Sequence, residues 1–302
     1  MIIDYPTSEF VRSVIRRYNP PTVPLSQIRE KYEPNRSVKT LTVGFVGDIC
    51  PISGRSLSIG KGLKEMLSSC DRLVGNFEGL VAAKRPRTFR LLHEESIFDS
   101  LRCLAPSDKW LLGVANNHAG DFGDDGFEST LEKLDSNSFP WFGTLDRPFG
   151  DLGHGIVLSA WSMWMNRANN RIPRTDPGPM GTFSIAYPHW GFEFVEKPDH
   201  TMQVPEDYDM VVAHHTHMPL PMEKKEDGRL IAWSLGNFCT GNPLKSLSRG
   251  AVVMATFELT TVPRLRSAHF EPISITHSQD GNVEVRVTSS SASSTNLTRY
   301  AH

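Results

Sequence analysis

Three histidines within four positions form the densest group of chemistry-bearing residues in the sequence. His214, His215 and His217 follow a short apolar run, Met-Val-Val-Ala, at 210–213. A buried parallel strand delivers its last residues to the carboxyl edge of its sheet, where ligands bind, and neutral imidazole is the commonest transition-metal ligand. We therefore predict that His215 and His217 bind metal. The alternative is a solvated, histidine-rich loop.

Carboxylates end two earlier apolar runs. Asp48 follows a strand expected at 41–48, where a buried carboxylate costs free energy unless it is paired or binds a cation. A helix expected at 53–66 leaves an alternative, in which Asp48 caps that helix. Asn76 and Glu78 end the next run and lie on one face at strand spacing. Both runs thus bring oxygen ligands to strand ends.

The run at 110–115 ends in an amide and an imidazole before a helix expected at 127–134. Asn117 can offer its carbonyl oxygen to a metal, whereas His118 would point differently and serve acid–base chemistry. Asp121 is close enough in sequence to orient the His118 ring. Turn formation alone would explain Asp121, because Asp favours turns, but it would not explain His118.

Two further strand ends carry polar residues. His189 follows a strand expected at 182–187 and is predicted to be a ligand, with a core or turn histidine as the alternative. Asn237 ends a strand expected from 228 and lines the site or simply forms a turn. Carboxylate, amide and imidazole groups at five strand ends suffice for two divalent metal ions. This mixture suits Mn²⁺, Fe or Zn²⁺ better than Mg²⁺ alone.

Two arginine-rich segments accompany these strand ends. Arg85 and Arg87 lie in the basic segment 84–90, which is either a solvated loop or a site for an anionic substrate, because the arginine fork matches phosphate and carboxylate. The segment 164–174, rich in Arg and Asn, is either plain surface or a lid over the site. We predict an anionic small molecule or polymer as the substrate.

Composition describes an ordinary globular protein of 302 residues, with 39% hydrophobic and 22% charged residues. A net charge of −2 argues against a nucleic-acid partner. No apolar run approaches the roughly 20 residues that span a bilayer, and the first residues lack a basic leader with an apolar core. The four cysteines show no paired spacing, which is typical of reduced thiols. We expect a cytoplasmic protein without a membrane segment, and the sequence does not fix its oligomeric state.

Three regions are predicted along the chain. Residues 1–40 form an arm with an amphipathic helix at 8–18, packed on the domain or, alternatively, binding a partner. Residues 41–287 form the main domain, in which a loop joins two late strands at 250–260 and 282–287. Residues 288–302 form a flexible Ser/Thr-rich tail.

These residues, taken together, resemble one known family. The matching motifs are Gly47-Asp48, Asn76-x-Glu78, Asn116-Asn117-His118-x-x-Asp121-x-Gly123, His189-Trp-Gly191-x-Glu193, His214-His215-x-His217 and Ser234-Leu-Gly236-Asn237-Phe238. In this order, from about residue 41 to about 260, the chain resembles CapA-type proteins of poly-γ-glutamate capsule biosynthesis, which are related to the calcineurin-like metallophosphoesterases. The resemblance implies an α/β fold, a four-layer α/β/β/α sandwich with the site at one end of its two sheets.

The resemblance also implies roles for the site residues. Asp48 and His217 would bind one metal ion, and Glu78 would bridge to a second. The second ion would be held by Asn117, His189 and His215. A metal-activated hydroxide would attack phosphorus, and His118, steadied by Asp121, would protonate the leaving group. The residues assigned to substrate binding are Asn76, Glu193, Asn237, Arg85 and Arg87.

The sequence departs from the phosphoesterase pattern at four places. Cys50 replaces the histidine of the usual Asp-x-His, so one metal would be weakly held or bound by a thiolate. Glu78 replaces an aspartate, and His214 replaces a glycine and is expected to face away from the metals or to tune them. The span from Glu193 to Asp209 is too short and too Pro-broken for the helix the family carries there.

We therefore expect a metal-dependent hydrolase, most simply a dinuclear metallophosphoesterase. Two alternatives remain. One is a CapA-like protein that acts on, or binds, poly-γ-glutamate or another capsule polymer. The other is a non-catalytic metal-binding scaffold, which the missing Asp-x-His histidine favours.

Overall fold

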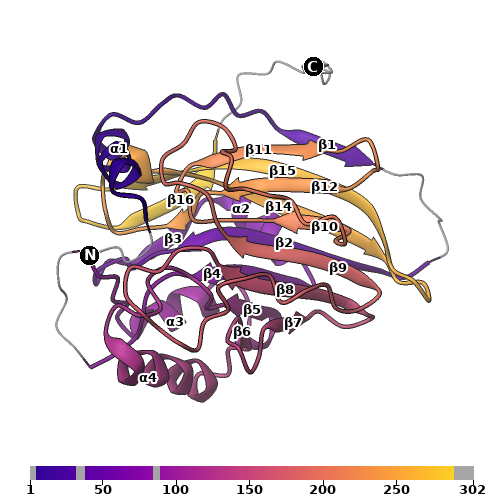
Figure 1. The fold of residues 1–302 in the computed structure, drawn as a ribbon, viewed down its shortest axis with the longest axis horizontal. Coiled ribbons are helices and arrows are strands. Elements are labelled where there is room, and N and C mark those ends of the chain that lie inside the picture. The colour runs from indigo at the N-terminus through magenta and orange to yellow at the C-terminus, as the bar shows by residue number, and fades with distance from the viewer. Residues whose placement is uncertain (1–4, 32–37, 84–88, 289–302) are drawn as a thin grey trace.

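The computed structural model describes residues 5–31, 38–83 and 89–288. Arg85, Arg87 and residues 289–302 of the predicted tail lie outside the described residues. The described chain forms two β-sheets stacked face to face (Figure 1). Aromatic pairs link the layers: the rings of Phe183 and Phe257 are 5.1 Å apart, and those of Phe142 and Tyr187 are 5.6 Å apart. The predicted α/β class with two packed sheets is confirmed.

The larger sheet has ten strands among the described residues, eight of them along one path. Their order is β3 (Leu57–Ile59), β16 (Val283–Val287), β15 (Arg264–His277), β14 (Arg249–Glu258), β2 (Thr40–Ile49), β4 (Arg72–Phe77), β5 (Trp110–Gly113) and β6 (Trp141–Phe142). Off this path, β1 (Ile28–Lys31) pairs with β15, and β13 (Asn237–Cys239) pairs with β2.

The smaller sheet has six strands in the described part of the chain. Their order is β11 (Pro219–Lys224), β12 (Leu230–Leu235), β10 (Met210–Val212), β9 (Phe183–His189), β8 (Ile156–Ser162) and β7 (Phe149–Asp151). Strands β8, β9, β10 and β12 run parallel, as do β2, β4, β5 and β6 of the larger sheet. Both parallel sets are almost wholly buried, as expected for strands covered on both faces.

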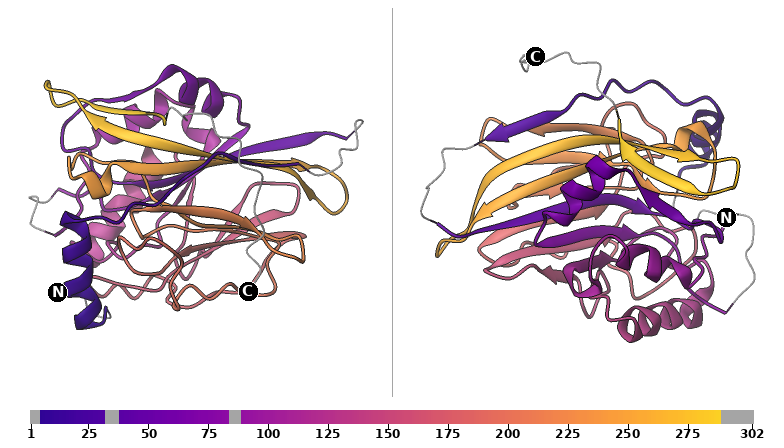
Figure 2. Two further views of the ribbon diagram at one scale, coloured as in Figure 1. Left: turned by 90° about the horizontal axis from the view of Figure 1, so that it is seen from above. Right: turned by 180° about the vertical axis from the view of Figure 1, so that it is seen from behind.

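Helices cover one outer face of the stack (Figure 2). These helices, which lie on the larger sheet, are α2 (Lys61–Ser68), α3 (Ser96–Arg102) and α4 (Gly123–Ser136). The outer face of the smaller sheet is covered instead by the segment 190–209, which contains no helix, as expected from its sequence. Its aromatic residues pack on Trp161 and Trp233 of that sheet.

Three further elements complete the fold. Helix α1 (Thr7–Tyr18) stands at the edge of the molecule (Figure 2). The 3₁₀ turns are η1 (Ser107–Lys109) and η2 (Lys245–Leu247). None of the helices in the described part of the chain could span a membrane; the longest, α4, has 14 residues.

Two expected elements differ from the structure. The loop predicted between the last two strands is wrong, because most of it forms β15, which has 14 residues. Its buried positions shift from Ala268 and Phe270 to Ile273 and Ile275 across Pro272, so that no single alternation marks it as a strand. The helix expected from residue 53 begins at Lys61, after the short strand β3.

Candidate metal centre

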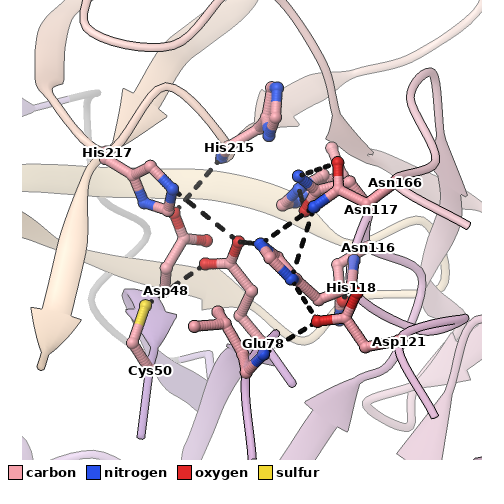
Figure 3. Close-up of polar contacts among 12 residues, drawn as sticks. Asp48, Cys50, Glu78, Asn116, Asn117, His118, Asp121, Asn166, His215 and His217 are labelled. Carbon is pink, nitrogen blue, oxygen red and sulfur yellow. Dashed lines mark hydrogen bonds and ion pairs between the residues drawn. The ribbon is translucent and has the colours of Figure 1, made fainter. Parts of the chain in front are cut away.

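Polar side chains from both sheets meet at one end of the stack (Figure 3). Asp48 is the second-last residue of β2 and Glu78 follows β4, whereas His189 ends β9 and the histidine segment follows β10. The two sheets approach closely here, because the Asp48 backbone N–H donates to the Gly236 carbonyl at 2.8 Å. A Cβ at Gly47 would lie 2.0 Å from that same oxygen, so the approach requires glycine. The predicted convergence of strand ends is what the structure contains.

Asp48 is fully buried and faces both sheets. Its Oδ1 accepts a hydrogen bond from Asn76 Nδ2 at 2.8 Å, and its Oδ2 accepts one from the His215 backbone N–H at 3.4 Å. The alternative role of Asp48 as a helix cap is wrong, because α2 begins after Gly60. Asp48 therefore belongs to the cluster.

His217 joins the two carboxylates. Its Nδ1 lies 3.5 Å from Asp48 Oδ2 and 3.0 Å from Asn237 Oδ1, and its Nε2 lies 3.8 Å from Glu78 Oε1. Burial lowers the pKa of His217, but Glu78 and Asp48 outweigh burial and raise it to about 10. Burial and the Asp48 charge raise the pKa of Glu78 to about 7. These shifts follow from burying two carboxylates and an imidazole against one another.

Three more histidines lie side by side on the smaller sheet. His189 Nε2 is 2.9 Å from Asn117 Oδ1, and His189 Nδ1 is 2.8 Å from His214 Nδ1. The His189 and His215 rings are 4.4 Å apart. Burial, with the neighbouring histidines, holds the pKa values of His189 and His215 well below their ordinary value. Neutral imidazoles of this kind are competent metal ligands.

His214 does not face away from the cluster. A parallel bridge pairs it with His189, so both side chains lie on the same face of the sheet. His214 Nδ1 also lies 3.9 Å from Asp48 Oδ1. The expectation that His214 tunes its neighbours remains compatible with this position.

The backbone is unusual at two of the histidines. His215 has φ 99° and His217 has φ 56°, positive values that residues other than glycine adopt in only a few per cent of cases. Such conformations cost about 1–3 kcal/mol each and persist where the surroundings impose them, most often at functional sites. Here the hydrogen bonds of His217 to Asn237 and of His215 to Asp48 fix the segment.

His118 lies across the cluster from the histidine segment. Its Nδ1 is 2.6 Å from Asp121 Oδ2, and its Nε2 is 3.9 Å from Glu78 Oε1. Asp121 is held in turn by Arg167 Nη1 at 2.9 Å and by the Leu91 backbone N–H at 2.8 Å. Burial lowers the pKa of His118, but Asp121 outweighs it and holds that pKa above the ordinary value. His118 thus has its Nδ1 beside Asp121 and its Nε2 directed toward Glu78.

The segment 164–174 lies against this histidine. Asn166 Nδ2 is 3.3 Å from His118 Nε2, and the Asn166 backbone N–H donates to the Asn117 carbonyl at 2.8 Å. A Cβ at Gly120 would lie 2.2 Å from the Arg167 carbonyl oxygen, so glycine allows this close approach. From the sequence, the segment was either plain surface or a lid over the site. In the structure, Asn166 lies against His118 and Asn117 within the site.

Other predicted site residues vary in position. Asn76 and Asn237 contact Asp48 and His217, respectively. Glu193 is half-buried, and its charge helps to raise the pKa of His118 and His217.

Tyr5 was not anticipated: its ring centroid is 6.3 Å from that of His215, and its hydroxyl accepts a hydrogen bond from the Glu193 backbone N–H at 2.7 Å. No sequence signal marks Tyr5, which lies in a segment far from the motifs.

The donor set fits metal ions. Buried atoms without a hydrogen-bond partner in the described chain include both ring nitrogens of His215, His214 Nε2 and Glu78 Oε1. Two groups of residues could each hold a metal ion. One comprises Asp48, His189 and His214, the other Cys50, Glu78 and His217, and within each group the ligand atoms lie within 4.8 Å of one another. Cys50 Sγ is 3.3 Å from Glu78 Oε2, so the residue that replaces the expected histidine does reach the cluster.

Fold and site together define a two-sheet α/β protein with a buried carboxylate–imidazole cluster at its strand ends. The chain belongs to the bacterial capsule synthesis protein family PGA_cap, whose model matches residues 42–148 and 163–242. It is 24% identical over 241 residues to the PGA biosynthesis protein CapA of Bacillus subtilis, a match covering 66% of this chain and 63% of that protein. The chain thus matches less than two thirds of the length of that relative.

Two solved structures align with the chain at low similarity. The calcineurin-like phosphoesterase YfkN of Bacillus subtilis aligns with a TM-score of 0.43 and 11% identity, over 78% of this chain and 90% of that one. The NAD nucleotidase NadN of Haemophilus influenzae aligns with a TM-score of 0.40 and 11% identity, over 82% of this chain and 53% of that one.

Proposed function

We propose that the chain is a metal-dependent hydrolase that cleaves a phosphoester at this cluster. The observation that carries the proposal is the convergence of buried donor atoms that lack partners, above all the two nitrogens of His215 and Glu78 Oε1. A buried polar atom left without a partner costs about 1–3 kcal/mol, and more when it is charged. Bound cations would remove that cost. A cluster with a purely structural role would have no reason to keep these atoms without partners.

We assign the ligands of two divalent ions as the family resemblance implies. Asp48 and His217 would hold one ion, Glu78 would bridge, and Asn117, His189 and His215 would hold the other. Cys50 is an additional candidate ligand, and His214 would orient His189 through the contact between their Nδ1 atoms. Mn²⁺, Fe and Zn²⁺ suit these donors. When bound, the ions would supply a nucleophile derived from water near neutral pH and offset charge on the phosphoryl oxygens.

His118 would act as the general acid. Its Nδ1–H donates to Asp121, which leaves Nε2 directed toward Glu78 and able to deliver its proton to a leaving oxygen. Arg167 and the Leu91 backbone N–H fix the Asp121 carboxylate, so that the ring does not rotate. Asp121 is in this proposal a positioning residue.

The remaining residues divide into two groups. The side chains of Asn76 and Asn237 contact Asp48 and His217, and we propose that they position these ligands. Glu193, Arg85 and Arg87 remain proposed substrate contacts. The two arginines would suit an anionic substrate.

A second candidate function is action on a capsule polymer. It is favoured by the family match and by the name of the Bacillus relative, a PGA biosynthesis protein. In this case the same cluster would bind or cleave a γ-linked polyglutamate chain rather than a phosphoester.

One set of measurements separates these functions. Elemental analysis gives the bound metal, and p-nitrophenyl phosphate, its bis-ester and polyglutamate are then assayed with added Mn²⁺. Ester hydrolysis by the metal-loaded protein is expected, with at least about a hundredfold loss in Glu78→Gln. Glu271→Gln is the matched control, because Glu271 is a buried glutamate that binds Gln27 outside the cluster.

Each result has a defined consequence. Polymer cleavage without ester hydrolysis would replace the first proposal with the second. Bound metal without turnover of any substrate would make the protein a metal-binding scaffold. Equal loss in Glu78→Gln and Glu271→Gln would show that the loss reflects folding.

A further inference from the structure

Helix α1 is packed with its polar side inward. Glu9 and Ser13 are buried, at 6% and 2% exposure. The large apolar residues face outward, and their exposed fractions are 41% for Phe10, 53% for Val11, 38% for Val14, 61% for Ile15 and 72% for Tyr18. A surface helix normally does the reverse, because burial of apolar area is the main stabilising contribution.

The exposed residues form one continuous stripe. At about 100° per residue, Phe10, Val14, Tyr18, Val11 and Ile15 fall within an arc of about 140°. Arg17 flanks this arc on one side and Arg12 on the other. The arc therefore has an apolar centre and cationic borders (the α1 stripe, residues 10, 11, 12, 14, 15, 17 and 18).

The orientation of the helix is fixed by its buried side. Glu9 pairs with Arg12 at 3.1 Å and with Arg16. The helix also packs against η2. Both ion pairs lie within the helix, and its buried side carries Glu9 and Ser13, so the stripe lies on the opposite side and remains available to a partner.

We propose that the α1 stripe docks flat on a lipid surface that carries anionic headgroups. Interfacial helices share this layout: an apolar face enters the acyl boundary, while flanking arginines extend to the phosphates. A second copy of the chain fits less well, because pairing two stripes would bring the arginine borders of both helices together. The charge of the borders thus selects an anionic surface.

Docking would place the candidate metal centre close to that surface. Tyr5, two residues before α1, packs edge-on against His215. In η2, which packs against α1, the Leu247 carbonyl accepts a hydrogen bond from Asn237, which contacts His217. The docking itself does not depend on the proposed hydrolase function.

Sedimentation with lipid vesicles tests the proposal on the full chain. Vesicles of equal parts phosphatidylglycerol and phosphatidylcholine should bind the protein, and vesicles of phosphatidylcholine alone should bind it more weakly. Val11→Glu with Ile15→Glu should weaken binding by at least about tenfold. Val11 and Ile15 leave water when the stripe docks, and the charged side chains that replace them would not gain free energy in that way. Thermal unfolding confirms that each variant is folded.

The chain offers a closely matched control. Val262 and Leu145 are 53% and 61% exposed, the same fractions as Val11 and Ile15, and lie outside the α1 stripe. Val262→Glu with Leu145→Glu should bind as the parent does. Equal loss in both pairs would contradict the proposal, as would no vesicle binding by the parent.

The arginines provide an independent test. Arg12→Gln with Arg17→Gln should reduce binding to the anionic vesicles by about tenfold and leave the weaker binding to neutral vesicles unchanged. Unchanged binding to anionic vesicles would overturn the role of charge. Concentration-dependent dimerisation that Val11→Glu with Ile15→Glu abolishes, without vesicle binding, would assign the α1 stripe to a second copy instead.

Discussion

His118 Nδ1 lies 2.6 Å from Asp121 Oδ2, and the ring presents its other nitrogen to Glu78. The two residues are three positions apart on a single turn, so the pair forms locally. Asp121 is fully buried, and Arg167 and the Leu91 backbone N–H hold it. The imidazole therefore has one nitrogen paired with Asp121, one nitrogen that faces the cluster beside Asn166, and a fixed orientation.

Replacing each residue of this pair should lower turnover by a different amount. His118→Gln removes the proposed acid and should reduce kcat about 10²–10⁴-fold. Asp121→Asn keeps the ring but loses the anionic partner, and should reduce kcat about 10–100-fold. Steady-state kinetics with a poor and a good leaving group measures both.

The acidity of the leaving group distinguishes catalysis from folding. Esters with acidic leaving alcohols need little protonation, so both variants should recover most of their activity on them. His277→Gln is a control, since His277 Nε2 binds the Thr240 carbonyl outside the cluster. A uniform loss across all leaving groups would contradict the assignment of His118 as the acid.

The positions of the site residues follow from the sequence because parallel strands share an edge. Asp48, Glu78 and His189 each end a short apolar run, and such runs are buried strands whose carboxyl ends coincide. The pattern therefore predicts which side chains meet. It does not predict distances, because these depend on how two sheets pack.

The details that the sequence did not predict depend on non-local geometry. His214 faces the cluster because it bridges His189 across the sheet, and the segment then turns through positive φ at His215 and His217. Nothing in a run of three histidines specifies those dihedral angles. Similarly, β15 is a strand because β14, β16 and β1 pair with it, although its own alternation is broken.

Metal affinity should depend differently on neighbouring histidines. His215→Gln removes two unpartnered nitrogens and should lower metal affinity at least about a hundredfold. His214→Gln removes the contact that orients His189 and should cost only about tenfold. Titration of the apoprotein with Mn²⁺ and Zn²⁺ gives both values. A larger loss in His214→Gln would identify His214, grouped with Asp48 and His189, as the direct ligand.

Cys50 should set metal preference. Its thiol is buried 3.3 Å from Glu78, and burial together with the Glu78 charge raises its pKa well above the ordinary value when no cation is bound. A bound Zn²⁺ would favour the thiolate, so Cys50→Ser should lower Zn²⁺ affinity about 10–100-fold and leave Mn²⁺ affinity nearly unchanged. Competitive titration measures the ratio. Cys239→Ser is the control, because Cys239 is also a buried thiol but binds the Cys50 carbonyl. Equal loss for both metals in Cys50→Ser would exclude thiolate ligation.

His93 should make the metal-free protein sensitive to acid. It is buried, stacked 4.3 Å from the Phe77 ring, and its Nε2 lies 3.0 Å from the Glu78 carbonyl oxygen. Burial lowers the pKa of His93 from 6.5 to about 3. Between pH 6.5 and about pH 3, His93 therefore binds a proton in the unfolded chain but not in the folded one. The free energy of unfolding is highest above about pH 6.5 and falls as the pH falls toward 3. Between about pH 7 and about pH 5 this one group should remove about 2 kcal/mol from the free energy of unfolding. Urea unfolding in the presence of a chelator should show a loss between these pH values that is smaller in His93→Gln than in the parent or in His277→Gln, by about the 2 kcal/mol that His93 contributes. An equal acid dependence in His93→Gln would mean that other groups of the cluster, not His93, control the acid sensitivity.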